Sequence, residues 1–244
     1  MIQKIVLLII KFFDQLHNKK IINFLKKKKF DKFEIFLDVG AHKGETISLF
    51  LRSFDISKII SFEASPINFK FLKNNENKLK NKFNKSKIII ENIALGKEKK
   101  IEKFKQFIET SSSTISDIDQ ESKYFKKKYK YLNLFNSQKL FKVYDIQIHT
   151  LYDYLTQNKL KKVDFLKIDT EGFEFEILKG LKKNISEVNL IMFEHHYDNM
   201  LKKKYKFKDI HNLLVSNNFK MFFKAKMPFR KTFEYIYING KSLN

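Results

Sequence analysis

Apolar residues follow two alternating patterns along this chain. Short, almost uninterrupted apolar runs lie at residues 35–39, 59–62, 88–90, 163–168 and 188–193. Such runs are typical of strands that are buried on both faces of a sheet. Between these runs, apolar residues recur every three or four positions, as at Ile47, Phe50 and Phe54, which is typical of helices with one buried face. The chain therefore alternates strands with helices.

This alternation predicts an α/β fold. Strand–helix units that follow one another favour a parallel sheet with right-handed crossovers and helices on both faces. Two later runs, Phe219–Phe223 and Phe233–Ile238, are separated by a loop that contains Pro228. They predict an antiparallel pair of strands that closes the sheet.

Local signals mark where two of the helices begin. Ser65 precedes Pro66, as an N-cap precedes the first helical residue, and apolar spacing carries this helix on through residues 71–83. Thr150 and Asp153 resemble a capping box, which predicts a short helix after residue 150. Both signals place a helix directly after a polar, hydrogen-bonding residue.

The first 34 residues form a separate N-terminal extension that we expect to be helical. Residues 5–10 are all apolar and are bracketed by Lys4 and Lys11, but the run is far too short to span a membrane. We favour a helix pair that packs on the edge of the core. The alternative is an interfacial helix whose flanking lysines contact anionic lipid, which would make the protein a peripheral membrane protein.

Residues 35–244 then form one domain, with an insertion at about residues 97–148 that breaks the strand–helix rhythm. Within the insertion we expect strands at residues 101–107 and 143–148, a polar loop at 110–114, and a lysine-rich aromatic helix or loop at 123–134. We place the insertion at the functional edge of the sheet, where a variable segment sets acceptor specificity.

The charge and cysteine content narrow the functional classes. The net charge is +22, yet only two of the 49 basic residues are arginine and the lysines are scattered. Nucleic-acid surfaces favour the bidentate arginine fork, so we disfavour a nucleic-acid partner. The absence of cysteine excludes disulfides, thiolate-ligated metals and a cysteine nucleophile, and it fits a reducing cytoplasm.

The first predicted strand runs into a glycine-bearing turn. The sequence Asp38-Val-Gly40-Ala41-His-Lys-Gly44 is followed by a helix, and the second strand ends on Glu63. Glycine permits a tight turn close to a ligand, the helix start offers free N–H groups, and the distant acid can accept both hydroxyl protons of a ribose. This layout predicts a nucleoside-cofactor site.

Polar residues follow each of five predicted strands. They are Asp38, Glu63, Asn92, Asp169 with Glu171, and Glu194 with His195 and His196. In an open parallel sheet the carboxyl ends of the strands share one edge, and ligands bind there. An acid at one strand end often only caps the next helix, but five such ends together favour a site.

Several of these segments together resemble the FkbM-type S-adenosylmethionine methyltransferases. The matching runs are Phe36–Thr46, Phe62–Pro66, Asn92–Gly96, Leu166–Glu174 and Leu178–Gly180. The resemblance implies a Rossmann-like class I methyltransferase fold, with a seven-stranded, mostly parallel sheet and a reversed last strand. Two positions depart from the family pattern, because His42 stands where Asn is usual and Ala64 where Pro is common.

The resemblance also implies roles for individual residues. Asp38, Gly40, Ala41 and Gly44 would shape the pocket for the methionine half of S-adenosylmethionine, and Thr46 would meet its carboxylate. Glu63 would hold the ribose hydroxyls, and Asn92 and Ala94 would flank the adenine. Asp169 would lie beside both the sulfonium and the acceptor.

The implied reaction is methyl transfer to an oxygen, which requires alignment of the two reactants and a general base. Asp169, Glu171 and His195 are the candidate catalytic residues, with His196 a weaker candidate than its neighbour. A magnesium ion held by Asp169, Glu171 and Glu194 is a disfavoured alternative, since carboxylates at one edge also serve as bases or helix caps.

We therefore expect an O-methyltransferase acting on a hydroxyl of a sugar, a surface-glycan precursor or another small metabolite. The alternatives are an RNA methyltransferase that uses the lysine-rich surface and a non-catalytic binding protein that retains the fold. Steeply salt-dependent RNA affinity would indicate the first alternative. Cofactor binding without turnover on any glycan would indicate the second.

Overall fold

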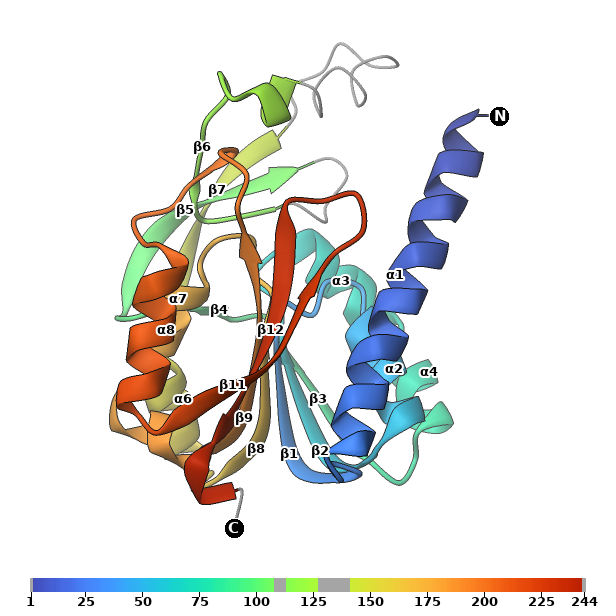
Figure 1. The fold of residues 1–244 in the computed structure, drawn as a ribbon, viewed down its shortest axis with the longest axis vertical. Helices are drawn as coiled ribbons and strands as arrows, with labels where there is room; N and C mark the ends of the chain where they lie inside the picture. The colour runs from blue at the N-terminus through green and yellow to red at the C-terminus, as the bar shows by residue number, and fades with distance from the viewer. Residues whose placement is uncertain (1, 108–112, 127–140, 243–244) are drawn as a thin grey trace.

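A seven-stranded sheet forms the centre of the computed structural model, which describes residues 2–107, 113–126 and 141–242, the first ten of these by their backbone alone (Figure 1). The strand order is β11-β12-β9-β8-β1-β2-β3. Strand β12 runs opposite to the other six strands of this sheet, so the predicted fold with a reversed last strand is confirmed. The strands are β1 Lys32–Val39, β2 Asp55–Phe62, β3 Lys87–Glu91, β8 Val163–Ile168, β9 Val188–His196, β11 Phe219–Lys226 and β12 Thr232–Asn239.

Helices cover both faces of this sheet (Figure 1). One face carries α1 Ile2–Lys27, α2 Glu45–Ser53, α3 Pro66–Asn74 and α4 Glu76–Lys82, and the other carries α6 Leu151–Gln157, α7 Glu174–Lys179, the 3-10 helix η1 Lys182–Glu187 and α8 Phe207–Ser216. Because side chains alternate along a strand, each strand feeds two cores. Phe36 and Met192 pack under α1 and α2, whereas Leu37 and Phe193 pack under α6 to α8.

The two predicted helix starts are confirmed. The Ser65 hydroxyl accepts a hydrogen bond from the Asn68 N–H, and the Thr150 hydroxyl accepts one from the Asp153 N–H. The helix after Ser65 does not continue to residue 83 as predicted, because it breaks at Asn75 into α3 and α4. The Asn75 side chain bonds to the Phe71 carbonyl, and such local competition with the backbone favours a helix end.

The N-terminal extension is one helix rather than the predicted pair. Residues 1–34 contain neither glycine nor proline, so nothing in the sequence interrupts α1. Its inner side buries Ile21 and Leu25 against the sheet. Strand β1 then starts at Lys32, three residues before the predicted Ile35. Among the described residues, no helix has both the length and the apolar character needed to cross a bilayer.

The insertion builds a small sheet of its own in the order β4-β7-β5. Its strands are β4 Ala94–Leu95, β5 Lys100–Phe107 and β7 Phe141–His149, and the last two match the predicted strands. Strand β6 Asp117–Ile118 pairs with β10 Leu201–Lys202, and the 3-10 helix η2 Gly240–Ser242 follows β12. The predicted polar loop at 110–114 and the lysine-rich segment at 123–134 lie mostly outside the described residues.

Candidate active site

Three strand ends are tied together at the turn after β1. The N–H groups of Gly40 and Ala41 both donate to the Phe62 carbonyl, at 2.9 and 3.0 Å, and the Asp169 N–H donates to the Val39 carbonyl at 2.9 Å. Gly40 has a φ of +86°, and a Cβ at this position would lie 1.8 Å from the Asp169 carbonyl oxygen. Only glycine fits this turn, as the sequence predicted.

Glu63, at the end of β2, is buried and connects two backbone segments. Its Oε2 accepts from the His42 N–H at 2.6 Å, and its Oε1 accepts from the Ser65 N–H at 2.8 Å. Burial raises the pKa of Glu63 to about 7, although the two N–H bonds oppose this change. The Asn92 side chain donates to the Glu63 carbonyl at 2.7 Å, so the predicted adenine-flanking and ribose-binding residues lie together.

The other predicted cofactor residues surround this turn. Gly44, with a φ of +89°, is the N-cap of α2, and Thr46 lies half-buried in the first turn of that helix. Ala94 is buried in β4 and pairs with Ile148 of the insertion. The structure therefore brings the predicted residues to one edge of the sheet, and their contacts with a cofactor stay predictions.

The buried Lys167 lies between two acids at the carboxyl ends of β1 and β8. The Lys167 Nζ lies 3.0 Å from Asp169 Oδ2 and 3.9 Å from Asp38 Oδ1. Asp38 is completely buried, and its Oδ1 has no hydrogen-bond partner among the described residues. Burial raises the pKa of Asp38 to about 6. Desolvation acts to raise the pKa of Asp169, but the neighbouring Lys167 cation lowers it below its ordinary value.

Three further acids and a histidine complete this charged cluster. The His196 Nε2 lies 3.1 Å from Glu194 Oε1 and 3.3 Å from Glu171 Oε2, and its Nδ1 lies 3.5 Å from Asp198 Oδ2. Burial acts to lower the pKa of His196, but these carboxylates raise it well above its ordinary value. Burial raises the pKa of Glu194 to about 8, and the adjacent Asp169 charge adds to this effect.

His195 lies on the opposite face of β9. Its ring packs against Tyr197 at 4.8 Å and against Tyr205 and Phe207, both at 5.8 Å between ring centroids. Burial lowers its pKa to about 3, and its Nδ1 has no hydrogen-bond partner among the described residues. The structure therefore brings His196, and not the favoured His195, to the candidate acids Asp169 and Glu171.

Asp169 is the most accessible member of the cluster. Its side chain is 33% exposed, whereas those of Lys167, Glu194 and His196 are only 7–9% exposed. A substrate that approaches from solvent therefore meets the Asp169 carboxylate first. Two surface hollows, one between α4 and β3 and one near the start of β8 and β9, lie away from this edge. In the described part of the chain, no group of three or more acids and histidines has the arrangement of a metal site.

Glu174 holds the loop that carries Asp169, a role that the sequence analysis did not assign. It is fully buried, and its Oε1 accepts from the Thr170 N–H and hydroxyl, both at 3.2 Å, and from the Gly172 N–H at 2.9 Å. Its Oε2 accepts from the Tyr205 hydroxyl at 2.5 Å. Glu174 ends the run Leu166–Glu174 and stands two residues after Gly172. An acid so close behind a glycine turn could have been predicted to accept the N–H groups of that turn.

The insertion contacts both halves of this edge. The Thr114 hydroxyl donates to the Glu171 carbonyl at 2.7 Å, and the Ser116 hydroxyl donates to the Gly172 carbonyl at 2.9 Å. On the other side, the Ser65 hydroxyl donates to the side-chain Oε1 of Gln106. These contacts put the insertion at the edge where the sequence placed it.

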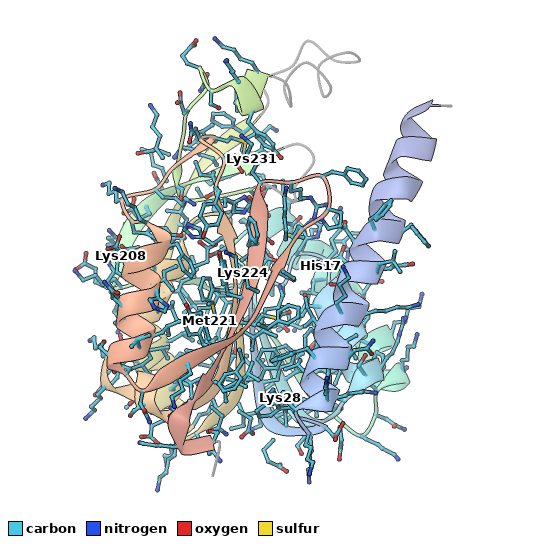
Figure 2. All side chains as sticks on the ribbon, in the orientation of Figure 1. His17, Lys28, Lys208, Met221, Lys224 and Lys231 are labelled. Atoms are coloured by element: carbon cyan, nitrogen blue, oxygen red, sulfur yellow. The ribbon has the colours of Figure 1, made fainter. Side chains whose placement is uncertain are left out.

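Helix α1 also reaches the charged cluster. The His17 Nε2 lies 2.6 Å from Glu234 Oε2, and both side chains are buried (Figure 2). Glu234 lies directly opposite Glu194 on the neighbouring strands β12 and β9. His17, Ile21 and Leu25 share one side of α1 at four-residue spacing, a signal of burial that the sequence analysis did not use.

Comparisons with known proteins agree with this geometry. The model of the FkbM methyltransferase domain matches residues 38–221. A comparison with curated proteins found no match. Among solved structures, the FkbM methyltransferase of Methylobacillus flagellatus KT is similar, with a TM-score of 0.56 and 15% identity over 85% of this chain and 44% of that chain. The present chain thus spans less than half the length of that relative.

A second solved relative is the magnesium protoporphyrin IX methyltransferase of Synechocystis PCC 6803, which was solved with bound S-adenosylmethionine. Its TM-score is 0.51, with 8% identity over 95% of this chain and 82% of that chain. At such identities the likeness shows a Rossmann-like methyltransferase fold. The family match covers well over half of the 244 residues, so the chain belongs to the FkbM methyltransferase family.

Proposed function

We propose that this chain transfers a methyl group from S-adenosylmethionine to a hydroxyl of a sugar, a surface-glycan precursor or another small metabolite. The observation that carries the proposal is the position of Asp169. Its carboxylate is the accessible member of a buried charged cluster, and its backbone packs against the Gly40 turn. One residue thus borders both the expected cofactor turn and the solvent from which an acceptor arrives.

The residues present fit the methionine half of the cofactor. Asp38 offers a buried oxygen without a hydrogen bond among the described residues, since the Lys167 Nζ lies 3.9 Å away, and a buried acceptor of this kind is costly unless a ligand supplies a donor. Gly40 turns the backbone after Asp38 with a φ of +86°, and Gly44 begins α2 with a second glycine turn. We infer that these residues hold the amino acid part of the cofactor, with Thr46 at its carboxylate.

Glu63 has acceptor positions left for the ribose hydroxyls. A carboxylate has about four acceptor positions, and Glu63 uses one for the His42 N–H and one for the Ser65 N–H. We infer that the ribose hydroxyls donate to the remaining positions, while Asn92 and Ala94 border the adenine.

When bound, S-adenosylmethionine supplies an electrophilic methyl group on a positively charged sulfur. The chain must then orient the acceptor hydroxyl and receive its proton. Asp169 is ionised near neutral pH because Lys167 lowers its pKa, so it can accept the hydroxyl hydrogen bond. Its neighbour Glu194, with a pKa raised to about 8, keeps its own proton near neutral pH, which leaves Asp169 as the proton acceptor. We therefore assign proton removal to Asp169, with Glu171 fixing His196 beside it.

Calorimetry with S-adenosylhomocysteine and NAD⁺ tests the cofactor assignment. We expect the chain to bind the homocysteine compound and not NAD⁺, and Glu63→Gln to weaken binding about tenfold or more. A matched control is Glu91→Gln, because Glu91 ends the next strand and its carboxylate accepts from the Tyr154 hydroxyl of α6. Binding of neither compound, or equal weakening by both substitutions, would refute the assignment.

Release of S-adenosylhomocysteine with different acceptor pools tests the reaction. Turnover with saccharides that carry free hydroxyls, lost in Asp169→Asn, would support the proposal. Turnover with RNA alone would overturn the choice of acceptor but leave the cofactor assignment intact. Cofactor binding without turnover on any pool would favour a binding protein that retains the fold.

A further inference from the structure

The first turns of α1 extend beyond the functional edge of the sheet. Helix α1 leads into β1 through a short connection and runs in the opposite direction, so its N-terminus lies at the carboxyl end of the strand (Figure 1). A 26-residue helix is about 39 Å long and an eight-residue strand about 26 Å. The first eight or so residues of α1 therefore project past the end of β1, on the side from which substrates arrive.

The projecting end is apolar, and the described residues next to it are exposed. Residues 5–10 are all apolar, with Lys4 before them and Lys11 after them. Phe12 is 56% exposed, and Phe229, in the turn between β11 and β12, is 73% exposed. The Phe229 ring contacts Phe13 at 5.1 Å between centroids, so the helix and the turn present one apolar surface.

This apolar surface is held rigidly and lies among cations. The two guanidinium nitrogens of Arg230 lie 3.1 and 3.0 Å from the two Asp14 carboxylate oxygens, which fixes the turn to α1 and neutralises that acid. Lys19 and Lys20 on α1 and Lys231 beside the turn are exposed (Figure 2). The whole chain carries a net charge of +22. An apolar surface flanked by lysines is complementary to an anionic lipid surface.

We propose that the N-terminal end of α1, together with the β11–β12 turn, docks on an anionic membrane surface. The exposed Phe12 and Phe229 side chains enter the boundary between headgroups and acyl chains, and Lys19, Lys20 and Lys231 contact lipid phosphates. Since α1 projects from the carboxyl edge of the sheet, docking holds Asp169 toward the membrane. Resting on the proposed function, this orientation assigns the acceptor hydroxyl to a membrane-bound molecule, such as a lipid-linked saccharide.

Vesicle flotation tests the docking without cofactor or acceptor. We expect the full chain to float with vesicles of phosphatidylcholine mixed with phosphatidylglycerol, to stay unbound with phosphatidylcholine alone, and to be released by salt. Phe12→Glu and Phe229→Glu should each weaken binding about tenfold or more, because they place a carboxylate in the apolar surface. The matched controls are Val215→Glu and Ile101→Glu, at positions that are 49% and 73% exposed elsewhere on the molecule.

Three results would overturn the inference. One is failure to bind anionic vesicles, and another is equal weakening by the control substitutions. The third is a concentration-dependent dimer that Phe12→Glu converts to a monomer, because a second copy would then cover the surface. Flotation needs no methyl transfer, so it tests membrane binding even if the proposed methyl transfer is wrong. A chain that methylates free saccharides without binding vesicles would retain the function and lose this inference alone.

Discussion

His195 and His196 are adjacent in the sequence and occupy opposite environments. His196 lies among Glu171, Glu194 and Asp198, and its pKa is raised well above its ordinary value. His195 lies among aromatic rings on the other face of β9, and burial lowers its pKa to about 3. Around β9, one face of the edge is therefore rich in acids and the other in aromatic rings, although they are separated by a single strand.

The difference follows from the pleat of the strand. Successive side chains point to opposite faces, so a shift of one residue exchanges α1 and α2 for α6 to α8 as packing partners. The charged face carries the groups that can accept or donate a proton, among them Asp169, Glu194 and His196. The aromatic face supports them, because its Tyr205 hydroxyl holds Glu174, which in turn holds the Asp169 loop.

The largest effect is expected from Asp169→Asn on the charged face. Asparagine keeps the size of the side chain but is a poor proton acceptor, so kcat should fall about 10²- to 10⁴-fold. Binding of S-adenosylhomocysteine should change by less than about tenfold. The measurement is steady-state turnover alongside calorimetry, with Glu176→Gln, a half-buried acid of α7 that pairs with Lys179, as a control. Turnover that stays within a fewfold of the unsubstituted chain would remove Asp169 from the mechanism.

A smaller effect is expected from Glu174, which connects the Asp169 loop to Tyr205 on the aromatic face. Glu174→Gln exchanges one acceptor oxygen for an amide donor in a fully buried site, so the free energy of unfolding should fall by about 2 kcal/mol. Tyr205→Phe removes a single bond to the same carboxylate and should cost less. Chemical denaturation measures both. Equal stability of all three proteins would contradict the role of Glu174 as the residue that orders the loop.

The pH dependence of stability sharpens the comparison further. Burial holds Glu194 protonated in the folded chain up to a pKa of about 8, whereas the unfolded chain releases the proton near the ordinary value of 4.5. Stability from this group is complete below the ordinary pKa and is lost as the pH rises toward about 8. Glu194→Gln should therefore lose less stability than the unsubstituted chain over that window. Thermal unfolding across the window measures the difference, and parallel curves would contradict the assignment.

The smallest effect is expected on the aromatic face. The buried Nδ1 of His195 lacks a hydrogen-bond partner among the described residues, so His195→Phe removes an unsatisfied polar atom. Stability should change by less than about 1 kcal/mol, and turnover should stay within a fewfold. A much larger loss of turnover at unchanged thermal stability would restore His195 as the base that the sequence analysis favoured.

The sequence predicted the main sheet because burial on both faces produces continuous apolar runs. The runs ending at Val39, Phe62, Ile168 and Phe193 became neighbouring strands. The glycine turn at Gly40 and the acid at Glu63 were also found, because a positive φ and a distant carboxylate require particular residue types. These features depend on the types of neighbouring residues, which can be read directly from the sequence.

Features that depend on tertiary packing were harder to predict. The face on which each histidine lies depends on where β9 ends, and strand ends are poorly marked in a sequence. The ion pair between His17 and Glu234 joins residues 217 positions apart, and the Tyr205–Glu174 bond likewise links separate elements. The predicted helix pair at the N-terminus was wrong, although the absence of glycine and proline from residues 1–34 already favoured one uninterrupted helix.

The contact between Gly40 and Asp169 has an evolutionary consequence. A methyl group at residue 40 would overlap the backbone carbonyl of residue 169, although 128 residues lie between the two positions. Every amino acid carries that carbonyl, so no side-chain change at residue 169 can relieve the overlap, and position 40 stays glycine while this contact leaves the residue at 169 free to vary. The insertion touches the neighbouring residues Glu171 and Gly172 through the hydroxyl groups of Thr114 and Ser116. Sequence drift in the insertion is therefore not bound by the constraint that fixes Gly40.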